Sequence, residues 1–357
     1  MHEAVLPKRL QNIQAIRTIA ALMVCAFHLQ YLFMNEGETK PFPNGEMGVQ
    51  VFFVISGLIM YHTTRDQYKS NNPLAFLLNR IIRIVPLYLL VTFVYVADDL
   101  SADFIAENAS RILTTVFFIA PMTDVIGPKY GYPLLDVGWT LNYEMFFYLL
   151  FGLSMFVQSH RYWLLIGAFV SIGVLYQLIA TGSFDPSYIT YHDYPHQAMN
   201  FYGNPIVLLF ALGVLAGMVL DRIQLSRKAA VFIFGITSIC FINHVLAWWS
   251  LPVNVFTDTA FVFTWVLAAA LCDKANVQVF PASVAKSGDS SYSLYLWHPV
   301  VFAYLRTVAE KMGLPYLEYP WMSFLLGLIS AMLVAWFSFK VIETRVTNFL
   351  RQKISMP

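Results

Sequence analysis

The chain has 357 residues, of which 58% are hydrophobic and only 12% are charged. Soluble domains carry about a quarter charged residues, so this composition excludes an ordinary water-soluble globular protein. The formal net charge of +1 gives no reason to expect a nucleic-acid partner. The three cysteines show neither disulfide nor metal-ligand spacing, and no metal is expected.

Long apolar runs recur from Ile13 to Ser338, with short polar loops between them. A helix needs roughly 20 apolar residues to cross a bilayer. We therefore predict an all-α fold: one polytopic membrane domain over residues 1–357, with about ten transmembrane helices. The predicted spans are 12–33, 47–63, 82–98, 138–157, 162–180, 205–221, 229–247, 256–272, 290–307 and 322–342.

A further apolar run, 112–121, is too short to cross and is predicted to be a re-entrant or interfacial helix. The distribution of basic residues supports this, because cytoplasmic loops carry the Lys and Arg excess. With the N-terminus inside, 17 of the 22 basic residues fall on the inner side. The outer five are Lys40, Arg111, Lys129, Arg306 and Lys311. If 112–121 crossed, the basic clusters at 222–228 and 340–353 would lie outside, so both termini are predicted to be cytoplasmic.

The first predicted span carries two ionisable residues, Arg17 and His28. Eleven residues of helix separate them by roughly 16 Å, about three turns, on nearly one face. Ionisable groups inside a bilayer are costly and mark candidate functional sites. Arg17, near the inner interface, is equally explained as a topology anchor. His28, near the outer end, is either a packed histidine or a general base.

The second span opens with a small-residue run from Gly48 to Gly57, which favours close helix packing. Ser56 in this run is assigned to packing, because no base can be paired with it. Arg80 and Arg83 follow at i, i+3 spacing, on one helix face at the inner end of the third span. Two guanidinium groups can grip phosphates, but they also fit an ordinary positive-inside anchor.

Glu144 lies about two turns below the outer start of the fourth span, at roughly the depth of His28. A carboxylate beside an imidazole fixes its tautomer and raises its basicity, so the two predict a catalytic pair; the alternative is a structural buried pair. In the ninth span, Tyr292, Tyr295 and His298 form a polar-aromatic stripe before Pro299. This stripe indicates either a cavity wall or helix packing.

Together these segments resemble the acyltransferase-3 family of membrane acyltransferases, in order and over nearly the whole chain. The matching pieces are Arg17 with His28, the run 48–57, Arg80 with Arg83, the run 139–144, the run 291–298, and Ile342 with Glu343. The resemblance is greatest to stand-alone members that acetylate exopolysaccharide. Gln50 departs from the pattern, because many members carry Asp there, and this puts in doubt a proton-relay or cation role at that position.

The resemblance implies an O-acyltransferase that moves an acyl group, expected to be acetyl, from acetyl-CoA or another acyl-CoA to a hydroxyl of a cell-surface glycan. It makes His28 catalytic, with Glu144 as its partner. The residues predicted to bind the donor are Arg17, Arg80, Arg83, Tyr292, Tyr295 and His298. The residues predicted to bind the acceptor are Trp139 and Tyr143.

Two other functions stay open at this point. A transporter or flippase for a glycan or lipid-linked substrate would also carry buried charges, although no internal repeat is evident. A non-catalytic scaffold for polysaccharide assembly is the third hypothesis. The predicted partners are acyl-CoA, a carbohydrate acceptor and membrane lipid, with homo-oligomerisation left open. The predicted location is the bacterial inner membrane.

Overall fold

A computed structural model describes residues 9–34, 39–65, 72–249, 251–252 and 254–354. The chain forms two compact units. Unit 1 comprises Met1–Ile59 and Gly213–Phe339, and unit 2 comprises Met60–Leu212 and Lys340–Pro357. Within the described ranges both units are helical and contain no strand, as the sequence predicts. Residues 1–8 and 355–357, the two chain ends that were predicted to be cytoplasmic, lie outside those ranges. Lys8 and Lys69, two of the basic residues assigned to the inner side, lie outside them as well.

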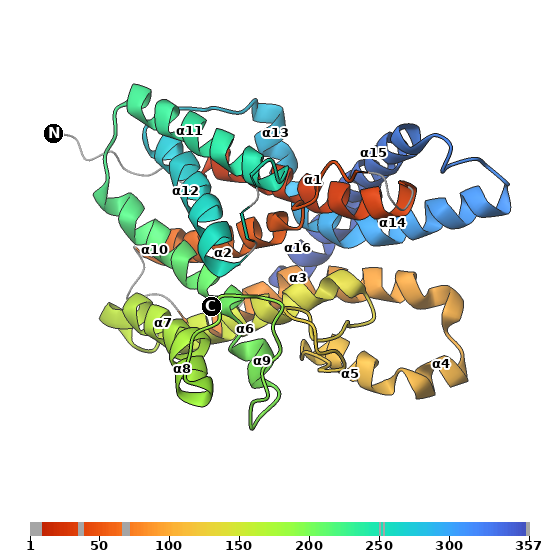
Figure 1. The fold of residues 1–357 in the computed structure, drawn as a ribbon, viewed down its shortest axis with the longest axis horizontal. Coiled ribbons are helices and arrows are strands. Elements are labelled where there is room, and N and C mark those ends of the chain that lie inside the picture. Colours follow the sequence, from red (N-terminus) through yellow and green to blue (C-terminus); the bar gives the residue numbers. More distant parts are fainter. Residues whose placement is uncertain (1–8, 35–38, 66–71, 250, 253, 355–357) are drawn as a thin grey trace. The chain divides into compact units, whose positions relative to one another are not determined.

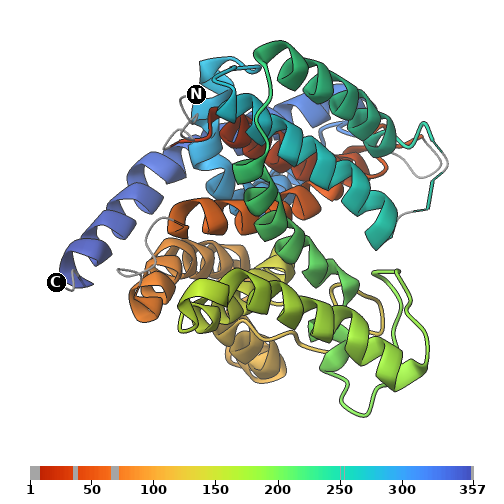
Figure 2. The same ribbon diagram turned by 90° about the vertical axis from the view of Figure 1, so that its left-hand side faces the viewer.

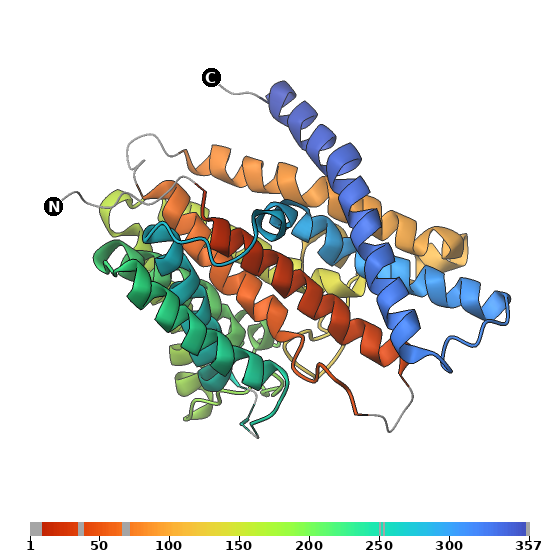
Figure 3. The same cartoon turned by 90° about the horizontal axis from the view of Figure 1, so that it is seen from above.

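Unit 1 is built on α1, which packs against α12, α13, α14 and α15. Figure 3 shows α1 running alongside α2, and Figure 2 shows α11 beside α12. The helices that lie wholly or partly in unit 1 are α1 (Gln11–Phe33), α2 (Met47–Thr64), α10 (Leu208–Arg222), α11 (Arg227–Val245), α12 (Val255–Lys274), α13 (Ala282–Ser287), α14 (Ser291–Lys311) and α15 (Pro320–Ser338) (Figure 1).

The packing of α1 with α14 and α15 forms a buried apolar cluster. Its members are Ala21, Cys25, Ala26, Leu29, Phe33, Leu294, Val301, Phe302, Phe324, Ala331 and Ala335. In α1 these residues recur at three- and four-residue spacing, the signature of one helix face. The cluster fixes the rotation of α1 and α14 about their axes, and it thereby sets the directions of side chains such as His28 and His298.

The start of α1 is held by a carboxylate from another helix. Asp273, near the end of α12, accepts from the backbone N–H groups of Asn12 (2.9 Å) and Ile13 (3.3 Å). These are among the first N–H groups of α1, which have no partner within the helix, and a negative charge is favourable there. Gly48 holds α2 against α1, because a Cβ at that position would collide with the carbonyl oxygen of Ala20. The predicted close packing at 48–57 is confirmed at this contact.

In unit 2, α3 packs against α6 and α16, and α6 packs against α7. A π-helical turn, Ser171–Leu175, joins α7 and α8 into one continuous segment. The helices that lie wholly in unit 2 are α3 (Pro73–Val96), α4 (Ala102–Glu107), α5 (Ala109–Phe117), α6 (Trp139–Ser154), α7 (Arg161–Val170), α8 (Tyr176–Thr181), α9 (Met199–Tyr202) and α16 (Thr344–Ile354).

Each of the ten predicted spans overlaps a helix of the structure. Among the described residues, eight helical segments are long and apolar enough to cross a membrane. Neither α6, which has 16 residues, nor the more polar α14 is among them, so a count of ten stays a prediction. The run 112–121 falls largely in α5, whose nine residues are too few to cross a bilayer. The all-α polytopic fold is confirmed.

The third helix begins at Pro73, nine residues before the predicted start at 82. Asn72 caps it, because its side chain accepts from the N–H groups of Leu74 (2.9 Å) and Ala75 (3.3 Å). Pro73 occupies the first turn, where a missing N–H costs nothing. Arg80 and Arg83 therefore lie two to three turns inside α3 rather than at its first residues.

Candidate active site

Two histidines meet in unit 1. The Nδ1 atom of His28, on α1, lies 3.2 Å from Nε2 of His298, on α14. The Nδ1 atom of His28 also lies 2.9 Å from the carbonyl oxygen of Val24, one turn earlier on the same helix. The Nδ1 atom of His298 lies 3.3 Å from the carbonyl oxygen of Leu294. His298 is fully buried, whereas His28 is partly exposed. The predicted catalytic histidine is therefore accessible, and its structural neighbour is a second imidazole.

Aromatic side chains enclose His298. The rings of Tyr295 and Phe302 approach it edge-on, with centroid distances of 5.9 and 5.5 Å. Tyr295 is itself buried, while Tyr292, on the same helix, is partly exposed. The stripe predicted on this helix thus contributes His298 and Tyr295 to the surroundings of His28. The predicted contact of these residues with a donor stays a prediction.

Arg17 lies on α1, three turns before His28. Its guanidinium donates to the side-chain oxygen of Gln14 (3.0 Å), and the residue is partly exposed. Arg17 therefore keeps its predicted place near one end of the helix.

Unit 2 contains a cavity of about 400 Å³ with three arginines in its wall. Arg80 and Arg83 come from α3, and Arg351 comes from α16, which packs on α3. The remaining lining residues are Thr63, Thr64, Asn72, Ala75, Phe76, Asn79 and Met155. Three guanidinium groups with threonine and asparagine side chains between them form a site suited to phosphate groups. Arg351 was not predicted.

Aromatic rings hold Arg80 in place. Its guanidinium carbon lies 5.4 Å from the ring centre of Phe76 and 5.5 Å from that of Tyr148, within the range of cation–π attraction. The hydroxyl of Tyr148 donates to the carboxylate of Glu144, one turn earlier on α6. Glu144 also acts electrostatically on Arg80, as do Arg83 and Arg351. The acid and the arginines predicted from separate motifs therefore belong to one polar group in unit 2.

The two predicted acceptor-binding residues differ in their exposure. Trp139, the first residue of α6, is partly exposed and meets the ring of Tyr143 edge-on. Tyr143 is fully buried; its ring stacks on Phe201 at 3.8 Å, and its hydroxyl donates to the carbonyl of Pro128 at 2.8 Å. Tyr143 thus occupies a packed position, whereas part of Trp139 is exposed. The predicted contact of both residues with an acceptor stays a prediction.

A buried charged group that was not predicted lies in unit 1. The carboxylate of Asp258, on α12, lies 2.9 Å from Nε2 of His244, on α11, and both side chains are fully buried. Gln50, on α2, donates to the other carboxylate oxygen of Asp258 at 2.9 Å. The signal was present in the sequence, because Asp258 falls inside the predicted span 256–272. Where many members of the family carry Asp, this chain has Gln50, whose side chain donates to the carboxylate of Asp258.

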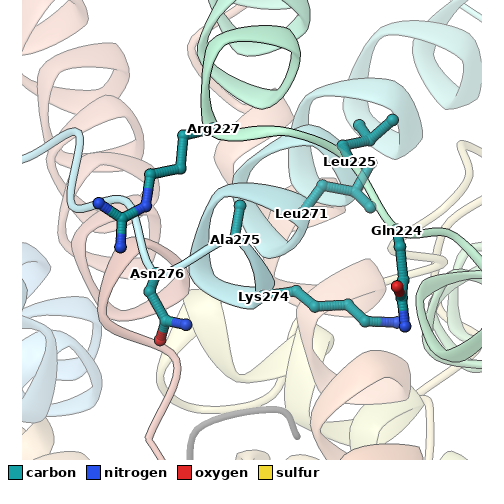
Figure 4. A pocket seen from close by; sticks show the side chains of 7 residues that line it. All are labelled: Gln224, Leu225, Arg227, Leu271, Lys274, Ala275 and Asn276. Atoms are coloured by element: carbon teal, nitrogen blue, oxygen red, sulfur yellow. The ribbon is translucent and has the colours of Figure 1, made fainter. Parts of the chain in front are cut away.

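A second cavity, of about 280 Å³, lies in unit 1 (Figure 4). Its lining residues are Gln224, Leu225, Arg227, Leu271, Lys274, Ala275 and Asn276. The ammonium of Lys274 donates to the carbonyls of Leu220 (2.7 Å) and Asp221 (3.0 Å), near the end of α10. Lys274 therefore satisfies carbonyls at a helix end, as a basic residue there commonly does. The arginine-lined cavity of unit 2 is the stronger candidate for phosphate groups.

The structure brings the predicted site residues together in two groups, one in each unit. His28, Tyr295 and His298 belong to unit 1, and Arg80, Arg83 and Glu144 belong to unit 2. The pairing of His28 with Glu144 joins residues of different units and stays a prediction. Within the described residues, no three His, Cys, Asp or Glu side chains gather in a way that could hold a metal ion.

Comparison with known proteins adds independent findings. A family model described as an acyltransferase domain matches residues 10–340. The exopolysaccharide production protein ExoZ of Rhizobium meliloti is 30% identical over 280 residues, which cover 76% of this chain and 81% of that protein. The O-acetyltransferase OatA of Staphylococcus aureus is 21% identical over 95% of this chain, and the peptidoglycan O-acetyltransferase OatA of Listeria monocytogenes is 24% identical over 95%. The matches cover 57% and 56% of those two proteins. No solved structure matches the chain significantly.

Proposed function

This chain belongs to the acyltransferase-3 family of membrane acyltransferases, and we propose that it is an O-acyltransferase. The enzyme moves an acyl group, expected to be acetyl, from acyl-CoA to a hydroxyl of a cell-surface glycan or exopolysaccharide. The O-acetyltransferase relatives support the reaction, and the exopolysaccharide production relative supports the acceptor class. The transporter or flippase hypothesis is not favoured, because the matching family model describes an acyltransferase domain and the two OatA relatives are O-acetyltransferases.

The observation that carries the donor assignment is the arginine-lined cavity of unit 2. Coenzyme A bears a diphosphate and a 3′-phosphate, and guanidinium groups bind phosphate oxygens in a planar, two-point geometry. Arg80, held between two aromatic rings, and Arg83 are the proposed phosphate ligands. Glu144 remains a proposed site residue. Its carboxylate accepts from the hydroxyl of Tyr148 and interacts electrostatically with Arg80.

The proposed base is His28 of unit 1. Its imidazole removes the proton from a sugar hydroxyl, and the alkoxide oxygen attacks the thioester carbonyl carbon. The new C–O bond replaces the C–S bond, and the departing thiolate takes the proton from the imidazolium. The products are the O-acylated sugar and free coenzyme A, so atoms and charges balance without any further reactant.

The membrane location follows from the eight long apolar helical segments among the described residues and from the membrane acyltransferase family to which the chain belongs. The protein is an integral membrane protein. We propose that it resides in the bacterial inner membrane with both termini in the cytoplasm, because 17 of its 22 basic residues then face inward. In this orientation the donor cavity opens towards the compartment that supplies acyl-CoA. Trp139 is the proposed contact for the acceptor.

The test is acyl transfer in membranes that contain the protein and its glycan acceptor. Labelled acetyl-CoA is expected to deposit its acetyl group on the glycan, and His28→Ala is expected to reduce the rate by at least about 100-fold, the smaller end of general-base effects. His160→Ala, a change at an exposed histidine outside both groups, is the matched control and is expected to keep the full rate. Full transfer by a normally expressed His28→Ala protein overturns the assignment of the base.

A further inference from the structure

The two histidines of unit 1 have defined proton positions. The Nδ1 atom of His28 faces the carbonyl oxygen of Val24, and the Nδ1 atom of His298 faces the carbonyl oxygen of Leu294. A carbonyl oxygen only accepts hydrogen bonds, so each Nδ1 must carry the hydrogen. A neutral imidazole has one N–H, so its lone pair is then on Nε2. Both rings are therefore assigned the Nδ1–H tautomer by the backbone of their own helices.

The contact between the rings fits this assignment in one direction only. The Nε2 atom of His298 carries a lone pair, and it lies 3.2 Å from the Nδ1–H of His28. His28 is therefore the donor and His298 the acceptor, with the proton of His28 shared between Val24 and His298. The reverse direction would require a second hydrogen on His298. The lone pair of the neutral His28 ring is on Nε2.

Burial separates the roles of the two rings. His298 is fully buried and has Tyr295 and Phe302 against its faces, whereas His28 is partly exposed. A charge on His298 would be costly in this apolar enclosure, and more so beside a protonated neighbour. His298 therefore stays a neutral acceptor, while the exposed ring is the one that can exchange a proton with a substrate.

We propose that His298 is the positioning residue of the catalytic histidine: its Nε2 accepts the Nδ1–H of His28 and thereby directs Nε2 of His28 to the acceptor hydroxyl. This inference rests on the proposed acyl transfer. When Nε2 of His28 takes the hydroxyl proton, both of its nitrogens carry hydrogen, and His298 accepts a bond from a cation. The proton then leaves with the thiolate of the donor. His298 remains neutral throughout and does not touch the donor, in contrast to the role predicted from the stripe.

Kinetics of two substitutions test the inference. His298→Phe keeps an aromatic ring but removes the acceptor atom, and it is expected to lower kcat about 10- to 100-fold, the loss of one hydrogen bond to a charged group. KM for acetyl-CoA is expected to stay unchanged. His298→Gln supplies an amide oxygen that accepts the same hydrogen, and it is expected to recover most of the lost rate. His160→Phe, the same change at an exposed histidine, is the control and is expected to keep the wild-type kcat.

Two outcomes of the His298→Phe kinetics overturn the inference. One is a wild-type kcat in His298→Phe. The other is an increase in KM for acetyl-CoA with kcat unchanged, which would make His298 a donor ligand. A loss of rate in both variants that is accompanied by a lower melting temperature of both would assign His298 to packing and also contradict the inference.

A measurement independent of turnover separates this inference from the proposed function. Nitrogen NMR of the histidine-labelled protein is expected to show a neutral Nδ1–H signal that disappears in His28→Ala and changes in His298→Phe. An Nε2–H tautomer for His28 overturns the inference even if the protein transfers acetyl groups. The expected tautomer without any acetyl transfer instead contradicts only the proposed function.

Discussion

At the scale of single residues, Asp258 shows how a carboxylate is kept deep inside unit 1. It has two donors, His244 and Gln50, and all three side chains are buried. A buried charge is tolerated only when it is paired and hydrogen-bonded. Because the donors come from two other helices, the group links α2, α11 and α12.

The first prediction follows from this link. Asp258→Ala leaves the donor groups of His244 and Gln50 buried without an acceptor, and we expect a loss of about 2–6 kcal/mol in stability, about 1–3 kcal/mol for each unsatisfied group. Asp258→Asn keeps an acceptor oxygen for His244 and is expected to lose less. Thermal unfolding in detergent measures both. Glu310→Ala, which removes an exposed partner of Arg306, serves as the control and is expected to leave the melting temperature nearly unchanged. An unaltered melting temperature in Asp258→Ala contradicts the prediction.

The same residues show what could be predicted from the sequence about single residues and what could not. Asp258 was recognisable as an acid within a predicted span, and His28 was predicted as a site residue from its depth. Their partners were not predictable. His244 and Gln50 come from other helices, and His298 is 270 residues away from His28. Spacing along one helix gives its faces, but only tertiary packing decides which faces meet.

At the scale of elements, α3 and α16 together form the arginine-lined cavity. The hydropathy pattern placed the start of α3 at 82, because Asn79 and Arg80 make the preceding turn polar. The cap at Asn72 and Pro73 was a readable signal for the true start. No pattern predicted α16, an amphipathic helix of 11 residues whose contribution depends on its contact with α3.

The second prediction concerns Arg351 of α16. Arg351→Gln removes one of the three guanidinium groups of the cavity. Hydrogen bonds to charged groups are worth about 1.5–3 kcal/mol, so we expect KM for acetyl-CoA to rise about 10- to 100-fold. KM for acetyl-pantetheine, which has no phosphates, should not change. Steady-state kinetics with the two donors makes the comparison.

The matched control for Arg351 is Lys353→Gln, which removes an exposed charge from the same helix but not from the cavity wall. It is expected to leave both KM values as they are. Equal effects of the two substitutions, or an equal effect of Arg351→Gln on both donors, would show that the phosphates do not bind at this arginine.

At the scale of the whole molecule, the direction in which each helix crosses the membrane rests on the charge distribution. All ten predicted spans exist as helices, but α6 and α14 lack the length or hydropathy of the other eight. Both carry polar residues of the candidate site, Glu144 and His298.

The third prediction tests this topology on either side of α14. Lys286 and Lys311 are exposed residues that precede and end the helix. In a Cys240→Ser background, where Cys25 and Cys272 are fully buried, a membrane-impermeant maleimide applied to intact cells should label Lys311→Cys. It should label Lys286→Cys only after the membrane is opened.

The reverse labelling pattern would mean that 112–121 crosses the membrane and that everything after it is inverted. Labelling of both cysteines in intact cells would mean that α14 does not cross. Either result would also contradict the proposal that the arginine-lined cavity receives acyl-CoA from the cytoplasm.

The division of the chain has a consequence for its biosynthesis. Unit 2 is inserted between the two parts of unit 1, so the ribosome completes most of unit 2 before it makes the second part of unit 1. At about 5–20 residues per second, about 14 to 54 seconds pass between the translation of His28 and that of His298. The nascent protein therefore holds His28, the proposed general base, before His298, the residue proposed to orient it, has been synthesised. A chain released before α14 would carry Arg80 and Arg83 of the arginine-lined cavity, but it would lack both Arg351 and His298.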